Sequence, residues 1–163
     1  MQFASWDPEQ RTFDAGPYVE WLTNHAAELP PGARAFATHP THYDYYAYRT
    51  RDEDLPPGSP LCTKDLLLAD VSVSDHDGPR VELRLAFPGF DPLLVGYDLV
   101  LAYDAVTELS ISARLDGPHR EGMRMSHLLI DEVAPTPTGI CHELGFATGA
   151  VKVCAADLRA TWR

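Results

Sequence analysis

Residues 80–87 read Arg-Val-Glu-Leu-Arg-Leu-Ala-Phe, and this stretch decides the class of fold. The residues at odd positions are all apolar, whereas those at positions 80, 82 and 84 are charged. A period of two places these two rows of side chains on opposite faces of a β-strand. The stretch therefore predicts a strand of an antiparallel sheet that buries one face and exposes the other.

The alternation continues on both sides of this strand. Clusters of Gly, Pro and Asp separate the alternating segments, which is the rhythm of an antiparallel sandwich or of a strongly curved sheet. A turn is expected at Thr148-Gly149, between two segments that would form a hairpin. The predicted strands are residues 66–74, 80–87, 97–103, 107–113, 126–133, 141–147, 150–154 and 158–162.

One amphipathic helix is predicted before the strands. Asp14 can cap its start, Pro17 suits its first turn and Pro30-Pro31 would end it. Between these signals, apolar residues recur at intervals of three and four, so they form a stripe that can pack on a sheet. The segment 30–64 is irregular, with a short strand expected at residues 34–36.

These elements predict one α+β domain over residues 1–163, dominated by an antiparallel sheet of about seven or eight strands. Residues 1–64 would supply the helix and an irregular segment rich in Tyr and Pro. Residues 65–163 would form the antiparallel β region, with the helix packed on it. A chain of this length can bury roughly 70% of its unfolded surface, which is enough for a substantial core.

Charge narrows the kind of partner. The chain has 24 acidic and 13 basic residues, a net charge of −11. Such a protein is steered toward basic partners and does not suit sequence-independent binding of nucleic acid. No stretch approaches the roughly 20 apolar residues that span a membrane. The start of the chain lacks the pattern of a secretory signal, and three cysteines without a CxxC motif predict free thiols and a cytoplasmic location.

His39, His42 and Asp44 form a cluster with a metal-ligating composition. Imidazole nitrogens and carboxylate oxygens are zinc ligands, so a metal-dependent or acid–base enzyme is one hypothesis. Pro40 disfavours a helix that would place both imidazoles on one face. A polar surface loop is the alternative interpretation of this segment, and we expect no cofactor.

His142 lies beside Glu143 in a predicted strand, with His127 and Asp131 on the preceding one. Neighbours along a strand point to opposite faces, so His142 should lie with Leu144 at the edge of the core, away from Glu143. An acid–base pair needs both groups on one face within hydrogen-bond reach. No nucleophile, phosphate-loop or zinc-protease motif occurs either, which favours a binding protein over an enzyme.

A run of tyrosines beside acidic residues is the strongest sign of a binding surface. Tyrosine provides a large contact area at low entropic cost, and acidic side chains attract a basic partner. Packing of alternate tyrosines on the sheet is the competing interpretation. The predicted contact residues are Asp44, Tyr45, Tyr46, Tyr48, Asp52, Glu53 and Asp54.

Four segments carry a family resemblance. Residues 64–73 read Lys-Asp-Leu-Leu-Leu-Ala-Asp-Val-Ser-Val, and residues 81–85 and 141–158 continue the pattern. Together with Phe-Ala-Thr-His-Pro-Thr-His-Tyr-Asp at 36–44, they resemble a group of small, uncharacterised bacterial proteins, many of them actinobacterial. Part of that group is classed with the immunity proteins of polymorphic toxin systems. The resemblance implies a protein that binds and blocks a basic toxin domain, and it assigns no catalytic residue.

The sequence thus supports three hypotheses. The first is a non-enzymatic acidic binding protein, such as an immunity protein. The second is an enzyme that uses His39, His42 and Asp44, with His142 as a further candidate. The third is a small-molecule binder whose pocket lies between helix and sheet, lined by Trp21 and the tyrosines.

Overall fold

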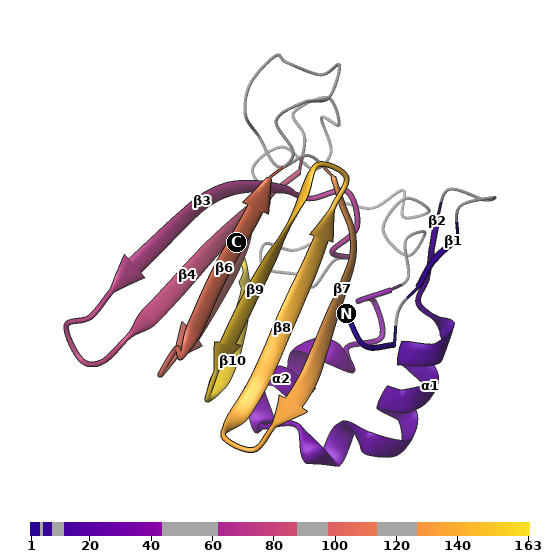
Figure 1. The fold of residues 1–163 in the computed structure, drawn as a ribbon, viewed down its shortest axis with the longest axis horizontal. Coiled ribbons are helices and arrows are strands. Elements are labelled where there is room, and N and C mark those ends of the chain that lie inside the picture. Colours follow the sequence, from indigo (N-terminus) through magenta and orange to yellow (C-terminus); the bar gives the residue numbers. More distant parts are fainter. Residues whose placement is uncertain (4, 8–11, 44–61, 88–97, 114–126) are drawn as a thin grey trace.

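The computed structural model describes residues 1–3, 5–7, 12–43, 62–87, 98–113 and 127–163 (Figure 1). Two antiparallel sheets of four strands face each other, and two short helices pack at one end of them. The first sheet has the order β10-β5-β4-β3, and the second has the order β6-β9-β8-β7. The predicted α+β class and its eight-stranded antiparallel region are confirmed. The first strands of the chain, β1 (Ser5–Asp7) and β2 (Thr12–Asp14), pair only with each other.

The strand bounds agree with the predicted segments to within a few residues. The first sheet contains β3 (Leu67–Ser74), β4 (Arg80–Ala86), β5 (Asp98–Asp104) and β10 (Asp157–Trp162). The second sheet contains β6 (Glu108–Ala113), β7 (Leu128–Thr136), β8 (Gly139–Phe146) and β9 (Gly149–Ala155).

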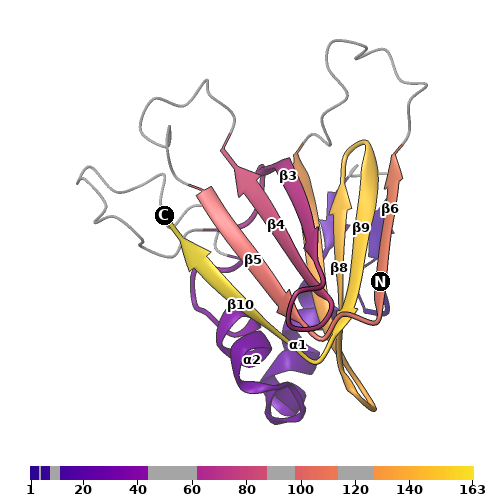
Figure 2. The same ribbon diagram turned by 90° about the vertical axis from the view of Figure 1, so that its left-hand side faces the viewer.

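The two sheets are continuous with each other along one edge. The chain passes from β5 to β6 and from β9 to β10 at the same corner, where strand pairing continues without a break. Thr107 N–H donates to the Cys154 carbonyl (2.8 Å), and Ala156 N–H donates to the Asp104 carbonyl (3.0 Å). Figure 2 shows the resulting wedge, with the sheets close together at the corner and apart at the opposite end. The structure is therefore a sandwich of two sheets that remain joined at one corner, so it has features of both predicted forms.

The core lies between the sheets. Val81, Leu83, Leu85 and Phe87 are all buried, as their alternation predicts. The inward-facing row of β5 lies beside this row in the same sheet, and the rows of β8 and β9 meet it across the wedge. The outward row of β4 is exposed, so the sheet has one wet face. Fully buried apolar side chains from the two sheets include Leu99, Leu101, Leu128, Val133, Ile140, Leu144, Val151 and Val153.

The helices cover the open edges of β7 and β10. Helix α1 (Gly16–His25) has Pro17 in its first turn and buries Tyr18 and Leu22, as predicted. A short 3₁₀ turn at Ala26–Glu28 then leads to α2 (Pro31–Ala37). Within the described part of the chain, no helix is long and apolar enough to cross a membrane.

The short strand expected at residues 34–36 is wrong, because these residues belong to α2. Pro31 opens the helix, and Asp157 satisfies its first N–H groups from β10. The Asp157 carboxylate accepts from Gly32 N–H (3.0 Å) and Ala33 N–H (2.8 Å). A Cβ on Gly32 would lie 1.9 Å from the Leu158 carbonyl oxygen, so only glycine allows this close approach of helix and strand.

Cys141 and Cys154 form a disulfide between β8 and β9, so the expectation of free thiols is wrong for this pair. The two residues are direct partners in the strand register, with Cα atoms 4.1 Å apart. Cys62 is a free, buried thiol. Burial raises the pKa of Cys62 to about 11, so it is a protonated and unreactive thiol at neutral pH.

Replacing Asp157 with Ala should lower the free energy of unfolding by about 1–2 kcal/mol, because α2 loses the acceptor for its first N–H groups. Chemical denaturation of Asp157→Ala measures the effect. Asp70→Ala on the exposed face of β3 is the matched control and should change stability by less than about 0.5 kcal/mol. Equal effects of the two substitutions would contradict the capping role.

Reduction of the disulfide should lower the free energy of unfolding by about 2–3 kcal/mol, because a 13-residue separation is no longer closed in the unfolded chain. The variant Cys141→Ala/Cys154→Ala should show the same loss and no response to reductant. Thiol titration checks the pairing: the unfolded, unreduced protein should expose only the thiol of Cys62. Three reactive thiols before reduction would contradict it.

Candidate functional site

A fully buried carboxylate, that of Asp131 on β7, lies at the centre of the polar interior. It accepts hydrogen bonds from His42 Nε2 (2.9 Å to Oδ2 and 3.0 Å to Oδ1) and from His142 Nε2 (3.1 Å). Thr63 Oγ1 donates a further bond to Oδ1 (3.0 Å). Three donors from three separate parts of the chain therefore surround one carboxylate.

His142 carries the network from one sheet to the other. The Tyr103 hydroxyl on β5 lies 2.7 Å from His142 Nδ1 on β8. Burial raises the pKa of Tyr103 well above its ordinary value, so the hydroxyl stays protonated. It donates a hydrogen bond to the imidazole Nδ1. His142 is then the tautomer that carries its proton on Nε2, where it donates to Asp131.

His42 carries a positive charge in this arrangement. Its Nδ1 lies 3.0 Å from the carbonyl oxygen of Phe36, and its Nε2 faces the Asp131 carboxylate. Both partners can only accept, so both ring nitrogens must carry protons. Burial raises the pKa of Asp131, but the His42 charge and the hydrogen bonds from His142 and His42 outweigh it. The net result is a pKa well below the ordinary range.

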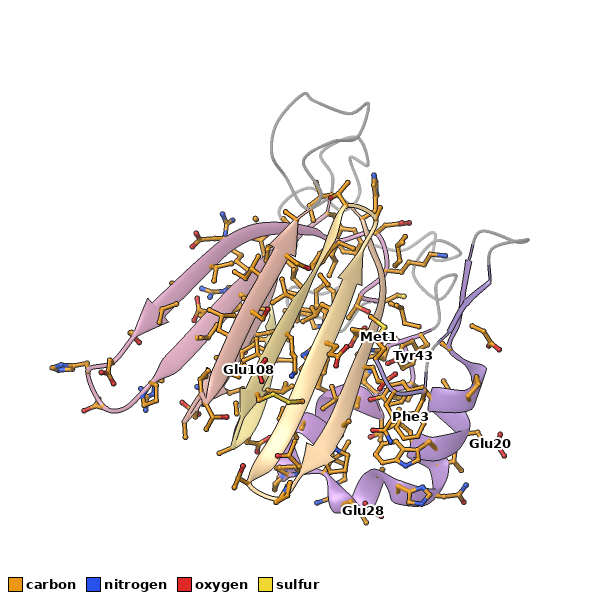
Figure 3. The ribbon with its side chains drawn as sticks, viewed as in Figure 1. Met1, Phe3, Glu20, Glu28, Tyr43 and Glu108 are labelled. Atoms are coloured by element: carbon orange, nitrogen blue, oxygen red, sulfur yellow. A yellow bond between two sulfur atoms is a disulfide. The ribbon has the colours of Figure 1, made fainter. Side chains whose placement is uncertain are left out.

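Further polar groups close the open edge of β7. The Tyr18 hydroxyl donates to the Val133 carbonyl (2.8 Å) and accepts from Val133 N–H (2.7 Å). The Tyr43 hydroxyl donates to the Asp131 carbonyl (2.9 Å). Figure 3 shows Phe3 and Tyr43 between α1 and β7, where they shield this edge. The edge strand thus meets side-chain groups in place of water or another strand.

The polar atoms of this network all have hydrogen-bond partners within the protein. Each ring nitrogen of His42 and His142 has a hydrogen-bond partner, as has each carboxylate oxygen of Asp131. Among the described residues, no buried side-chain nitrogen or oxygen lacks a partner. A general acid or base needs a free position within reach of its substrate. Every one of these groups is engaged by another group of the chain in this structure.

A cavity of about 190 Å³ lies beside the network, between α2 and β10. Figure 2 shows these two elements side by side at the helical end of the wedge. Phe36 and Trp162 supply aromatic walls, and the buried His42 ring forms part of the lining. The remaining described lining residues are Gly32, Ala35, His39, Thr41, Arg159 and Ala160.

A second hollow of about 270 Å³ lies between α1 and α2. Tyr43 and His39 line it together with apolar residues of α1 such as Val19 and Leu22. Trp21 lines neither hollow. It stacks between Phe3 (ring centroids 4.9 Å apart) and His25 (5.2 Å). The structure therefore has a cavity between helix and sheet, but Trp21 does not line it, and Tyr45, Tyr46 and Tyr48 lie outside the described residues.

His39 and His42 of the predicted metal set both line the cavity, but their ring nitrogens are engaged by different partners. His42 is buried and engaged through both nitrogens, whereas His39 Nδ1 bonds to Thr41 Oγ1 (2.9 Å). Asp44 lies outside the described residues, as do Tyr45, Tyr46, Tyr48, Asp52, Glu53 and Asp54. Among the described residues, no group of three His, Cys, Asp or Glu side chains is arranged so that it could hold a metal ion. The metal set and the contact surface at 44–54 stay predictions.

Sequence reasoning missed the pairing of Asp131 with His42 and His142. It considered His127, which is half-buried and whose Nδ1 lies 3.8 Å from Asp65 Oδ1. His142 was expected at the edge of the core, and it is fully buried. The alternation of side chains along β7 and β8 could have revealed the pairing. Val133 is the strand partner of His142, and Asp131, two residues earlier, lies on the same face of the sheet.

Comparison of the chain with protein-family models, with curated proteins and with solved structures found no match.

Replacing Asp131 with Asn should lower the free energy of unfolding at neutral pH by about 3 kcal/mol or more, because the charge of His42 stays buried without its partner. The pKa of Asp131 is lower in the folded state than in the unfolded state. Its contribution is thus complete at neutral pH and is lost progressively as pH falls below about 5.

Urea unfolding of wild type and Asp131→Asn across this range measures the difference, which should shrink toward acid pH. Asp98→Asn is the matched control, because Asp98 pairs with Arg84 at the surface (3.0 Å) and should matter by no more than about 1 kcal/mol. A difference between wild type and Asp131→Asn that is independent of pH would contradict the buried ion pair.

Proposed function

We propose that the protein is a non-enzymatic binding protein that takes up a small molecule in the cavity between α2 and β10. The observation that carries the proposal is the cavity itself, with Phe36 and Trp162 as aromatic walls. Ligand sites are concave and mostly apolar, with a few polar groups that fix orientation. The cavity has this composition.

The interior supports a binding role over a catalytic one. The His42–Asp131–His142 network is closed by internal hydrogen bonds, so it supplies a rigid wall and no free base. His42 is both a member of this network and a lining residue of the cavity. The buried ion pair therefore holds one wall of the cavity in place.

The volume sets the size of the ligand. A cavity of about 150 Å³ in a protein core accommodates benzene. The cavity here, at about 190 Å³, fits one ring with a short substituent. Ala35 and Ala160 contribute small side chains to its lining, so it can be narrowed by substitution without touching the network.

A second candidate function is the immunity-type protein that binds and blocks a basic toxin domain. The net charge of −11 favours it, and so does the family resemblance of the sequence. Its contact surface would be formed by Asp44, Tyr45, Tyr46, Tyr48, Asp52, Glu53 and Asp54. Exposed Glu20 and Glu28, which Figure 3 shows pointing away from the sheets, add to the acidic surface.

A cytoplasmic location belongs to the same proposal, and the disulfide bears on it. Disulfides persist in oxidising compartments and are rare in a reducing cytoplasm. Cys62, the free thiol, is buried and fits either compartment. Alkylation of thiols at the moment of cell lysis decides the point, because a cytoplasmic protein should be trapped with Cys141 and Cys154 reduced.

Single-ring compounds should bind in the cavity and stabilise the protein, by about 2.7 kcal/mol at a concentration 100 times Kd. Ligand-observed NMR and thermal unfolding measure this. Ala160→Leu fills the cavity and should abolish binding. Thr161→Leu lies on the next residue of the same strand, outside the lining, and should leave binding unchanged. Binding that survives Ala160→Leu would place the ligand elsewhere.

For the second candidate, Asp44→Asn/Asp52→Asn/Glu53→Gln/Asp54→Asn should lower affinity for a basic toxin domain at least about tenfold, because attraction between opposite charges is lost. The partner to test is a basic, toxic protein encoded beside this gene. Glu20→Gln/Glu28→Gln is the control for a general loss of charge. Unchanged affinity in the fourfold variant contradicts the predicted contact surface.

A further inference from the structure

The ligand class can be narrowed by the charges around the cavity, and this inference rests on the proposed binding function. Most described basic side chains pair with carboxylates: Arg80 with Asp104, Arg84 with Asp98, Lys152 with Glu108 and Arg163 with Glu82. Arg159 lines the cavity and forms no ion pair within the described part of the chain. No carboxylate of the described residues therefore competes with an anionic ligand for the Arg159 guanidinium.

His39 adds a hydrogen-bond donor to the same lining. Its Nδ1 accepts from the backbone N–H of Thr41 (3.3 Å), and the Thr41 hydroxyl lies 2.9 Å from the same nitrogen. The ring proton therefore sits on Nε2. Within the described residues this N–H has no hydrogen-bond partner, so it can donate to a ligand.

Carboxylates that could oppose an anion here are already engaged. Asp157, at the start of β10, accepts from the backbone N–H groups of Gly32, Ala33 and Leu158. Asp131 lies behind the His42 ring and is paired with its charge. The lining thus combines an exposed arginine, an imidazole N–H and the ring of a protonated histidine.

The apolar part of the lining selects the body of the ligand. Phe36 lies 4.4 Å from the His42 ring, centroid to centroid, and makes an edge-on contact with it. Trp162 faces the cavity from the same strand as Arg159. An apolar ring can lie between these groups while a charged substituent reaches toward β10. Arg is also the residue best suited to a carboxylate, because its planar fork donates two parallel hydrogen bonds.

We infer that the cavity between α2 and β10 binds a small carboxylate that carries a single apolar ring. Arg159 binds the carboxylate, His39 Nε2–H donates to it, and Phe36 and Trp162 enclose the ring.

Matched pairs of ligands test the inference. The probes are benzoate, phenylacetate and cyclohexanecarboxylate, each compared with its neutral amide of the same shape. Calorimetry and ligand-observed NMR give the affinities for wild type. At least one acid should bind about tenfold or more tightly than its amide, because a hydrogen bond to a charged group is lost in the amide.

Arg159→Gln should weaken binding of that acid by about tenfold or more and leave the amide within about twofold. Arg34→Gln is the matched control. Arg34 is an exposed arginine of α2 without an ion pair to the described residues, and it is not among the lining residues. It should leave both affinities unchanged. Thermal unfolding of each variant verifies that the fold is intact.

Different results would overturn the cavity as a ligand site and its preference for an anion. One outcome is that each acid and its amide bind equally well, both to wild type and to Arg159→Gln, and that Ala160→Leu blocks both. This outcome would overturn the preference for an anion, and the cavity would stay a binding site for neutral ligands. No binding of any of the six probes at millimolar concentration would overturn both. Binding of acids that Arg34→Gln and Arg159→Gln weaken equally would show general charge attraction and also overturn the site.

Discussion

The structure depends on one buried ion pair, between the Asp131 carboxylate and the His42 imidazolium. Desolvation makes an unpaired carboxylate at this depth unfavourable, so the side chains around it must all be in place at once. His42 follows α2, His142 comes from β8, and Tyr103 extends the network to the opposite sheet. A single charged pair thereby fixes how the helical layer sits on the wedge of sheets.

The same pair links the interior to the proposed ligand site. His42 faces Asp131 with one edge and contributes to the cavity lining, so the shape of that wall is set by hydrogen bonds deeper in the core. Asp157 has a comparable role on the other wall, since it ties the start of α2 to β10. Preorganised walls of this kind lower the entropic cost of binding a small ligand.

Local patterns in the sequence predicted most of the fold, because strand alternation and helix periodicity depend only on near neighbours. Contacts between distant residues were not predictable in this way. The α2 segment was interpreted as a strand because its cap, Asp157, lies 125 positions away. The disulfide was missed because the predicted turn is displaced by one residue. A turn at 148–149 does not place Cys141 opposite Cys154, whereas the observed turn at 147–148 does. The pairing of His42 with Asp131 spans 89 positions and has no local signal.

The separation of its members along the chain gives the network a place in the order of folding. The hairpins formed by β3 with β4 and by β7, β8 and β9 need only short loop closures, and the pairing of β7 with β8 already brings His142 next to Asp131. The network must then gather residues from positions 42 and 63 at Asp131 and from position 103 at His142. Non-local contacts pay a larger loop-closure entropy and form after local ones. By this reasoning we expect the local hairpins to form before the network closes, because its most distant contact joins His42 to Asp131 across 89 positions.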